Sequence, residues 1–177
     1  RAFLTLQELK RLQATACAVP LLKRAALFSA LTGLRFCDIQ QLRWEALHYS
    51  EAVGYHLRFS QQKTSGVETL PIAQPAYELM GERAKDSVLV FEGLPKVMTP
   101  WLTTQLRAWV KQAGIKKDIT FHCFRHSFAT LQLTLGVDIY TVSKLLGHKS
   151  LKVTQIYARI IDKKKQSAAE KLAAAWE

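Results

Sequence analysis

Two basic side chains in the run His-Cys-Phe-Arg-His, residues 122–126, have a spacing that suits phosphate chemistry. His122 and Arg125 are three residues apart, so on a helix they project from nearly the same side. The apolar residues Phe124 and Phe128 fall on a different stripe of that helix. A single phosphate group can contact both basic side chains, and the pattern therefore indicates an anion-binding pair.

The same run contains a second histidine, His126, four residues after His122. Zinc binding by this pair is disfavoured, because Arg125 would lie beside the ion and no Glu occupies the position that the HExxH motif requires. We expect His126 to be a buried imidazole that is hydrogen-bonded to the backbone. We expect no metal here.

Four further polar residues could act on a phosphate, and most of them also have an ordinary structural interpretation. Arg35 lies two residues after Gly33 at the end of an apolar helix, where arginine commonly pairs with the helix dipole or with a carboxylate. Lys63 lies in a turn-like segment, where lysines are usually solvated. His148 follows Gly147, and Tyr157 falls on an apolar helical stripe that could belong to the core.

The charge balance of the 177 residues narrows the class of partner. Lys and Arg total 25 against 14 acidic residues, which gives a formal net charge of +11. This excess favours an acidic partner such as nucleic acid over a neutral metabolite, with an anionic membrane as the weaker alternative. Apolar stretches fall short of the roughly 18 residues needed to cross a bilayer, and no signal-peptide pattern opens the chain. We therefore expect a cytosolic protein.

The cysteines give no sign of a metal or redox centre. Cys17, Cys37 and Cys123 are odd in number, widely separated, and form no CxxC pair. We expect them to be reduced thiols in the core.

Local signals place the basic residues on a mainly helical chain. Thr5 and Glu8 have the capping-box spacing, which predicts a helix that runs to about Cys17. Residues 21–31 are apolar nearly all round, as in a buried central helix, and Gly33 is placed to end it.

A small hairpin is expected after a short helical stretch at 38–42. Residues 53–59 alternate between apolar and polar, which predicts a half-buried strand with Val53 and Leu57 on the same face. The run 61–66 indicates a turn, and 67–72 returns as a second strand at a sheet edge.

The remainder predicts helices separated by glycine or proline, the first of them capped by Thr99 and Pro100. Their expected ranges are 100–113, 124–135, 139–146, 153–160 and a tail at about 166–177. The fold class is therefore mainly α with a small antiparallel β-hairpin or sheet. The length fits one domain, and because the chain begins at Arg1 we expect it to be part of a longer protein.

Taken in order, these residues resemble the catalytic domain of the tyrosine recombinases, the phage integrase family. The motifs that match are Thr-Gly-Leu-Arg at 32–35 with Asp38 behind it, Lys63, His-Cys-Phe-Arg-His at 122–126, Leu-Gly-His at 146–148, and Thr154 with Tyr157. The details Leu-Arg-Phe-Cys-Asp and Lys-Thr-Ser-Gly look most like integrases of mobile elements such as conjugative transposons.

The resemblance implies a DNA breaking and rejoining enzyme that works without a cofactor. By resemblance, Tyr157 attacks the scissile phosphate and leaves a 3′-phosphotyrosyl link. The residues expected to assemble around that phosphate are Arg35, Lys63, His122, Arg125 and His148. The resemblance also implies one catalytic domain over 1–177 whose tail helix docks onto a neighbouring protomer, with the family's N-terminal DNA-binding domain absent from this chain.

The implied partner is double-stranded DNA, bound by a homotetramer in the synapse and by a protein that is monomeric without DNA. The implied location is the bacterial cytoplasm. Basic side chains expected to contact DNA, or else simply to be solvated, are Arg43, Lys111, Lys116, Lys149 and Lys152. Two alternatives remain: relaxation of DNA in the manner of a type IB topoisomerase, and a non-catalytic DNA-binding module in which Tyr157 is core.

Overall fold

The computed structural model of the protein describes residues 2–60 and 67–148. Contacts along the chain form two compact units, the first ending at Phe128 and the second beginning at Ala129, and each unit is described by itself. The predicted turn at 61–66 and the predicted helices at 153–160 and 166–177 lie outside the described residues. The single domain over 1–177 therefore stays a prediction.

Helix α1, Leu6–Ala14, begins at the predicted capping box. Glu8 N–H donates to Thr5 Oγ1 at 3.2 Å, and Thr5 N–H donates to Glu8 Oε2 at 2.7 Å. The helix ends before the predicted limit near Cys17, because Thr15 adopts an extended conformation and its N–H caps the carbonyls of the last turn.

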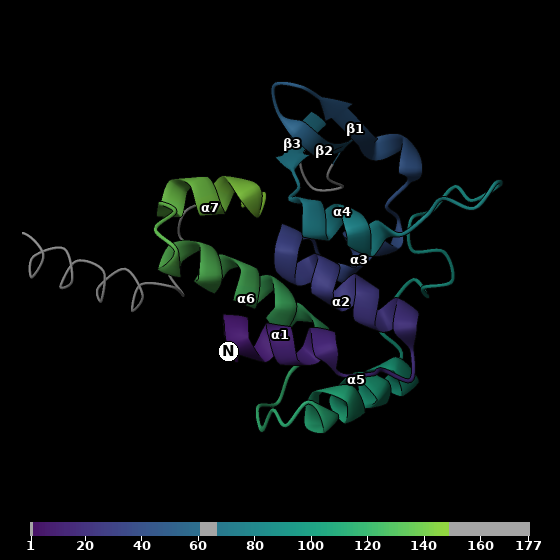
Figure 1. Cartoon of the computed structure of the whole chain (residues 1–177), viewed down its shortest axis with the longest axis vertical. Coiled ribbons are helices and arrows are strands. Elements are labelled where there is room, and N and C mark those ends of the chain that lie inside the picture. Colours follow the sequence, from purple (N-terminus) through teal and green to yellow (C-terminus); the bar gives the residue numbers. More distant parts are fainter. Residues whose placement is uncertain (1, 61–66, 149–177) are drawn as a thin grey trace, which may run out of the picture. The chain divides into compact units, whose positions relative to one another are not determined.

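Helix α2, Pro20–Thr32, is the predicted central helix of the first unit. It contacts α1, α3, α4 and α5, and Figure 1 shows it running between α4 and α1. Gly33 ends it in the left-handed conformation, with φ of 73°, which side chains with a Cβ adopt only with strain. Apolar residues on almost every side explain why this helix is covered by so many neighbours.

Helix α3, Phe36–Gln40, begins two residues before the predicted stretch at 38–42. The Asp38 carboxylate accepts the Arg35 N–H at 3.2 Å, so the polar cap lies at the start of the helix and draws the chain into it earlier. A single 3₁₀ turn, Trp44–Ala46, then leads into the sheet.

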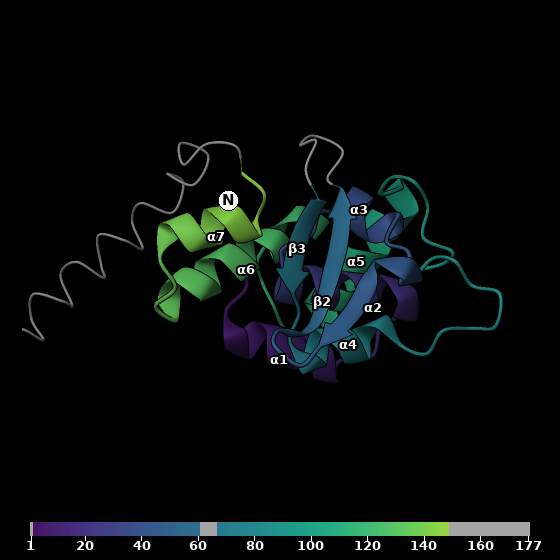
Figure 2. The same ribbon diagram turned by 90° about the horizontal axis from the view of Figure 1, so that it is seen from above.

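The sheet has three antiparallel strands in the order β1-β2-β3, as seen in Figure 2. They are β1 (Leu47–Ser50), β2 (Gly54–Ser60) and β3 (Val67–Pro71). The predicted hairpin is confirmed as β2 and β3, and Pro71 is the last residue of an edge strand. Strand β1 was not predicted, because its four residues show no apolar alternation and its backbone is held by pairing with β2.

The predicted faces of β2 are wrong in part. Leu57 is buried, but so is its neighbour His56, and Val53 is 50% exposed in the turn before the strand. The His56 imidazole Nδ1 lies 3.0 Å from the Gly54 carbonyl, a contact that lets a polar ring be buried beside Leu57.

Two more helices of the first unit, α4 and α5, pack against α2. The short helix α4, Gln74–Met80, was not predicted, and the ring of its Tyr77 stacks on Tyr55 of β2 at 3.9 Å. Helix α5, Pro100–Gln112, begins at Thr99 as predicted, with the Thr99 hydroxyl accepting the Leu102 N–H. In Figure 1, α4 lies between the sheet and α2.

Helix α6, Phe121–Thr134, and helix α7, Ile139–Leu145, confirm two predicted helices. Phe124 of α6 is fully buried and stacks on Trp109 of α5 at 6.2 Å. The predicted apolar stripe fails at its end, since Leu135 is 75% exposed. It lies just beyond the last helical residue, although its N–H still donates to the Leu131 carbonyl at 2.8 Å.

The three cysteines are free, but the prediction that all lie in the core is wrong. Cys123 is buried, whereas Cys37 is exposed. The earlier start of α3 explains this, because Cys37 then lies two residues from the buried Ile39 and so on the opposite side of the helix. Within residues 2–60 and 67–148, no helix is long and apolar enough to span a bilayer.

Candidate active site

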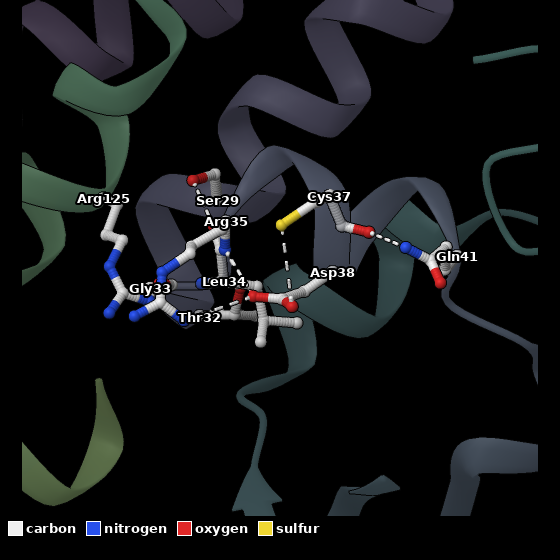
Figure 3. A network of polar contacts seen from close by, with 9 residues as sticks. All are labelled: Ser29, Thr32, Gly33, Leu34, Arg35, Cys37, Asp38, Gln41 and Arg125. Carbon is white, nitrogen blue, oxygen red and sulfur yellow. Dashed lines mark hydrogen bonds and ion pairs between the residues drawn. The ribbon is translucent and has the colours of Figure 1, made fainter. Parts of the chain in front are cut away.

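A tight turn after α2 carries the first of the predicted site residues. Gly33 N–H donates to the Ser29 carbonyl at 2.8 Å, and Leu34 N–H donates to the Thr32 hydroxyl at 3.3 Å. Figure 3 shows these groups together with Arg35 at the start of α3. The turn is fixed by hydrogen bonds on both sides of the glycine.

Arg35 leaves this turn with its side chain half-buried. Its guanidinium Nη1 lies 3.8 Å from Asp38 Oδ2, and its side chain is 33% exposed. The carboxylate that caps α3 is thus also the ion-pair partner of the arginine. The salt-bridge interpretation of Arg35 and the phosphate interpretation are compatible, because one face of a guanidinium can pair while another stays open to a ligand.

Arg125 and His122 lie on the first two turns of α6, with contrasting exposure. Arg125 is 5% exposed, and its Nη1 donates to the Gly33 carbonyl at 2.6 Å. His122 is exposed. The guanidinium of Arg125 is therefore held against the turn that precedes Arg35. The two hydrogen-bonded residues, Gly33 and Arg125, are 92 residues apart in the sequence.

One pocket of about 270 Å³ in the first unit brings these three residues together. Arg35, His122 and Arg125 all line it, and we call it the arginine pocket. Figure 3 shows the guanidinium ends of the two arginines at the Gly33 turn. The remaining lining residues are all uncharged: Ser29, Leu34, Phe36, Met98, Thr103, Leu106, Thr120 and Phe121. Two guanidinium groups and an imidazole in a pocket with apolar walls are groups of the kind that can bind an anion.

His126 is buried, as predicted for a structural imidazole. Its ring meets the ring of His122 edge to face at 4.7 Å. The predicted hydrogen bond from His126 to the backbone stays a prediction. Among the residues that the structure describes, no group of three or more His, Cys, Asp or Glu side chains is arranged to hold a metal.

The structure places only part of the predicted catalytic set. Lys63 and Tyr157 lie outside the described residues. His148 is half-buried in the second unit, where its N–H donates to the Ser143 carbonyl at 2.9 Å after the turn at Gly147. The three residues in the pocket come from the first unit alone.

Sequence reasoning missed the polar residues that frame the pocket. Ser29 is fully buried, and its Oγ donates to the Leu34 carbonyl at 2.8 Å. Thr120 lies just before α6, with its hydroxyl 3.4 Å from Cys123 Sγ. The signal for Ser29 was present, since it is a polar residue inside an apolar helix whose hydroxyl had to find a partner.

The predicted DNA contacts lie on exposed parts of the first unit where the structure describes them. Arg43 is exposed and pairs with Glu45 at 2.8 Å. Lys111 and Lys116 line a second, open groove of about 540 Å³ together with Arg107 and Lys117, which we call the basic groove. Lys149 and Lys152 lie outside the described residues.

An exposed thiol stands beside the arginine pocket without adding charge to it. Cys37 Sγ lies 3.9 Å from Asp38 Oδ1. Partial burial, and then the negative charge of Asp38, raise the pKa of the Cys37 thiol. The thiol therefore stays protonated near neutral pH.

Comparison with known proteins connects this geometry to a family. The phage integrase family model matches residues 2–164. The tyrosine recombinase XerA of Pyrococcus furiosus is 33% identical over an alignment of 149 residues that covers 79% of this chain and 50% of that protein. The chain thus spans about half the length of this relative.

Solved structures share the fold. The catalytic domain of bacteriophage HP1 integrase has a TM-score of 0.69 at 23% identity, over 96% of this chain and 94% of that one. The Tn1549 transposon integrase, in complex with transposon right end DNA, has a TM-score of 0.64 at 18% identity, over 97% and 66%. A mobile-element integrase is therefore among the structural neighbours, as the resemblance implied. Because the family model covers nearly the whole chain, this chain belongs to the phage integrase family.

Proposed function

We propose that the chain is the catalytic domain of a site-specific DNA recombinase that cleaves and rejoins strands through a 3′-phosphotyrosyl intermediate. The observation that carries this proposal is the pocket shared by Arg35, His122 and Arg125. Two of these residues come from one end of α6, and the third comes from a turn about 90 residues earlier in the chain. Such convergence of basic groups on one small pocket supports phosphate chemistry.

The two arginines supply electrostatic stabilisation. Attack on a phosphodiester places additional negative charge on its nonbridging oxygens, and planar guanidinium forks match these oxygens with two hydrogen bonds each. Arg125 is 5% exposed and held by the Gly33 carbonyl, so its guanidinium is oriented before the substrate arrives. Preorganised donors of this kind act without a reorganisation cost in the transition state.

The nucleophile in this proposal is Tyr157. Its phenol oxygen attacks phosphorus, the bond from phosphorus to the 5′ oxygen breaks, and the strand remains attached through its 3′ phosphate. His122 assists removal of the phenol proton, because tyrosine has an ordinary pKa of about 10. Lys63 donates a proton to the departing 5′ oxygen, and His148 donates a hydrogen bond to a nonbridging oxygen. The link keeps the energy of the broken bond for rejoining, and no cofactor is needed.

Double-stranded DNA is the proposed partner, with a homotetramer in the synapse and a monomer without DNA. The relative XerA is named a tyrosine recombinase, and the Tn1549 integrase is described in complex with DNA. The formal net charge of +11 supports the same partner. Outside the pocket, Arg43, Lys111, Lys116, Lys149 and Lys152 are the proposed phosphate contacts. The proposed location is the bacterial cytoplasm, in association with DNA.

The test traps the covalent intermediate on whichever DNA site the protein itself selects. The full-length product of the gene is incubated with lightly nicked genomic DNA of its source, so that a strand cleaved near a nick loses its 5′ end and cannot be rejoined. DNA that stays bound after denaturation is sequenced, and peptide mapping locates the attached residue. We expect an adduct at Tyr157 that Tyr157→Phe abolishes, with DNA affinity within about threefold of the parent.

Other outcomes separate the alternatives. Tight and site-selective binding without any adduct favours the non-catalytic module. An adduct with relaxation of supercoiled plasmid but no exchange between two sites favours the topoisomerase. An adduct that persists in Tyr157→Phe contradicts the proposed nucleophile.

A further inference from the structure

Ser29 is a buried residue that hydrogen-bonds to the turn next to which both arginines lie. Ser29 is fully buried within α2, and its Oγ donates to the Leu34 carbonyl at 2.8 Å. The Ser29 carbonyl also accepts the Gly33 N–H at 2.8 Å. Ser29 thus holds two successive residues of the turn, one through its backbone and one through its hydroxyl (Figure 3).

Both arginines depend on the position of this turn. The Gly33 carbonyl accepts the Arg125 Nη1 at 2.6 Å, and Arg35 follows Leu34 directly in the chain. A shift of the peptides at 33 and 34 therefore moves the carbonyl that accepts from Arg125. It also moves the backbone from which the Arg35 side chain extends. Bidentate recognition of one phosphate requires the two forks to stay within roughly 0.5 Å of their productive positions.

The other side-chain hydrogen bonds of the turn hold its N–H groups, whereas Ser29 holds the Leu34 carbonyl. Thr32 Oγ1 accepts the Leu34 N–H and donates to the Phe28 carbonyl, and Asp38 accepts the Arg35 N–H. The Leu34 carbonyl accepts from the Ser29 hydroxyl, which is the donor it has in the described residues. Ser29 also lines the pocket that holds Arg35 and Arg125.

We propose that Ser29 is a positioning residue, which sets the relative placement of the Arg35 and Arg125 guanidinium groups for a bound phosphodiester. This inference rests on the proposed function of the pocket. Ser29 is fully buried, and in this proposal it acts through the Leu34 carbonyl. Removal of its hydroxyl frees the turn and leaves a buried carbonyl that must seek another donor.

The first measurement is independent of DNA cleavage. Inorganic phosphate is titrated into the protein, and the arginine Nε–H signals are followed by NMR. We expect Ser29→Ala to weaken phosphate binding at least threefold. The matched control is Ser87→Ala, because Ser87 is also buried and its Oγ donates to a backbone carbonyl, that of Leu89, at 2.8 Å, but it does not line the pocket. We expect that control to bind phosphate as the parent does.

The second measurement is the rate of single-turnover cleavage of a DNA duplex that contains the site identified by sequencing the captured adduct. We expect Ser29→Ala to cleave about tenfold more slowly, with DNA affinity changed less than threefold. In an Arg35→Ala background the same substitution should cost less than twofold, because the pair it positions is already broken. If Ser29→Ala does not fold, Ser29→Cys keeps the shape with a weaker donor and is measured instead.

The outcomes separate the inference from the proposed function. If the parent binds phosphate but forms no adduct, the recombinase proposal fails, while the phosphate titration still decides the role of Ser29. If Ser29→Ala is folded and matches the parent in both measurements, the inference is overturned. The same holds if its defect is undiminished in the Arg35→Ala background.

Discussion

The arginine pocket and the basic groove contain similar charges in the same unit of the molecule, but the two regions hold them differently. Arg125 of the pocket is 5% exposed and donates to a backbone carbonyl. Arg107 of the groove is 60% exposed and pairs with Asp118 at 3.5 Å. The neighbouring Lys111 and Lys116 are exposed and, within the described residues, make no ion pair.

This difference separates two tasks that a positive charge can perform for a nucleic-acid enzyme. A buried, hydrogen-bonded guanidinium has lost its freedom during folding, so it can stabilise a transition state at no further ordering cost. An exposed lysine attracts the DNA backbone through counterion release, which raises affinity without selecting one phosphate. The pocket should therefore determine cleavage rate, and the groove should determine affinity and its salt dependence.

The strongest test of this contrast exchanges arginine for lysine in each region. Arg125→Lys keeps the charge but loses the planar fork, and we expect single-turnover cleavage to fall about 10² to 10³-fold. Arg107→Lys, the matched control, should stay within twofold of the parent. Circular dichroism checks that both variants are folded. Equal effects from the two substitutions would remove the distinction between pocket and groove.

A middle-sized effect is expected from reversing charge in the groove. The double variant Lys111→Glu with Lys116→Glu should weaken DNA binding at least tenfold and reduce the magnitude of the salt slope by about 2. Cleavage at saturating protein should change less than threefold. Fluorescence anisotropy over a salt series measures this. The control, Lys85→Glu with Lys96→Glu, makes the same change in net charge at exposed positions outside the groove. An equal loss in the control would mean that only net charge matters.

The smallest effect concerns Glu8, which neutralises one lysine of the groove. Its Oε2 lies 2.6 Å from Lys117 Nζ. Burial alone raises the pKa of Glu8, but the Lys117 hydrogen bond and charge, with the bonds from Thr5, outweigh it and lower the pKa overall. The ionised form therefore stabilises the fold at neutral pH, and this contribution is lost as the pH falls from about 4.5 through the lower folded pKa.

Glu8→Gln should accordingly cost about 1 kcal/mol of unfolding free energy at pH 7 and nothing at the acid end. It should also raise DNA affinity at low salt about twofold, because Lys117 is no longer neutralised. Urea unfolding at several pH values measures the first effect and anisotropy the second. A stability difference that persists unchanged below the folded pKa would contradict the assignment.

Local signals predicted the ends of helices better than they predicted the sheet. Thr5 with Glu8, Thr99 with Pro100, and the glycine after α2 act within one turn of chain, and the structure confirms each of them. Strand β1 and helix α4 were missed, since β1 is held by pairing with β2 and α4 by packing on the sheet and α2. Strand β1 has four residues and helix α4 has seven, and segments this short show no sequence pattern that reveals such contacts.

The amino-acid sequence by itself determined the family, through ordered motifs, and it determined that His122 and Arg125 share one side of a helix, because the helical period places them there. The tertiary structure alone decided that Arg125 is buried and bonded to the Gly33 carbonyl, and that Ser29 holds the turn on which both arginines depend. The reason is physical. Burial and the choice of a hydrogen-bond acceptor 92 residues away depend on how α2 and α6 pack, and no local pattern of the chain contains that information.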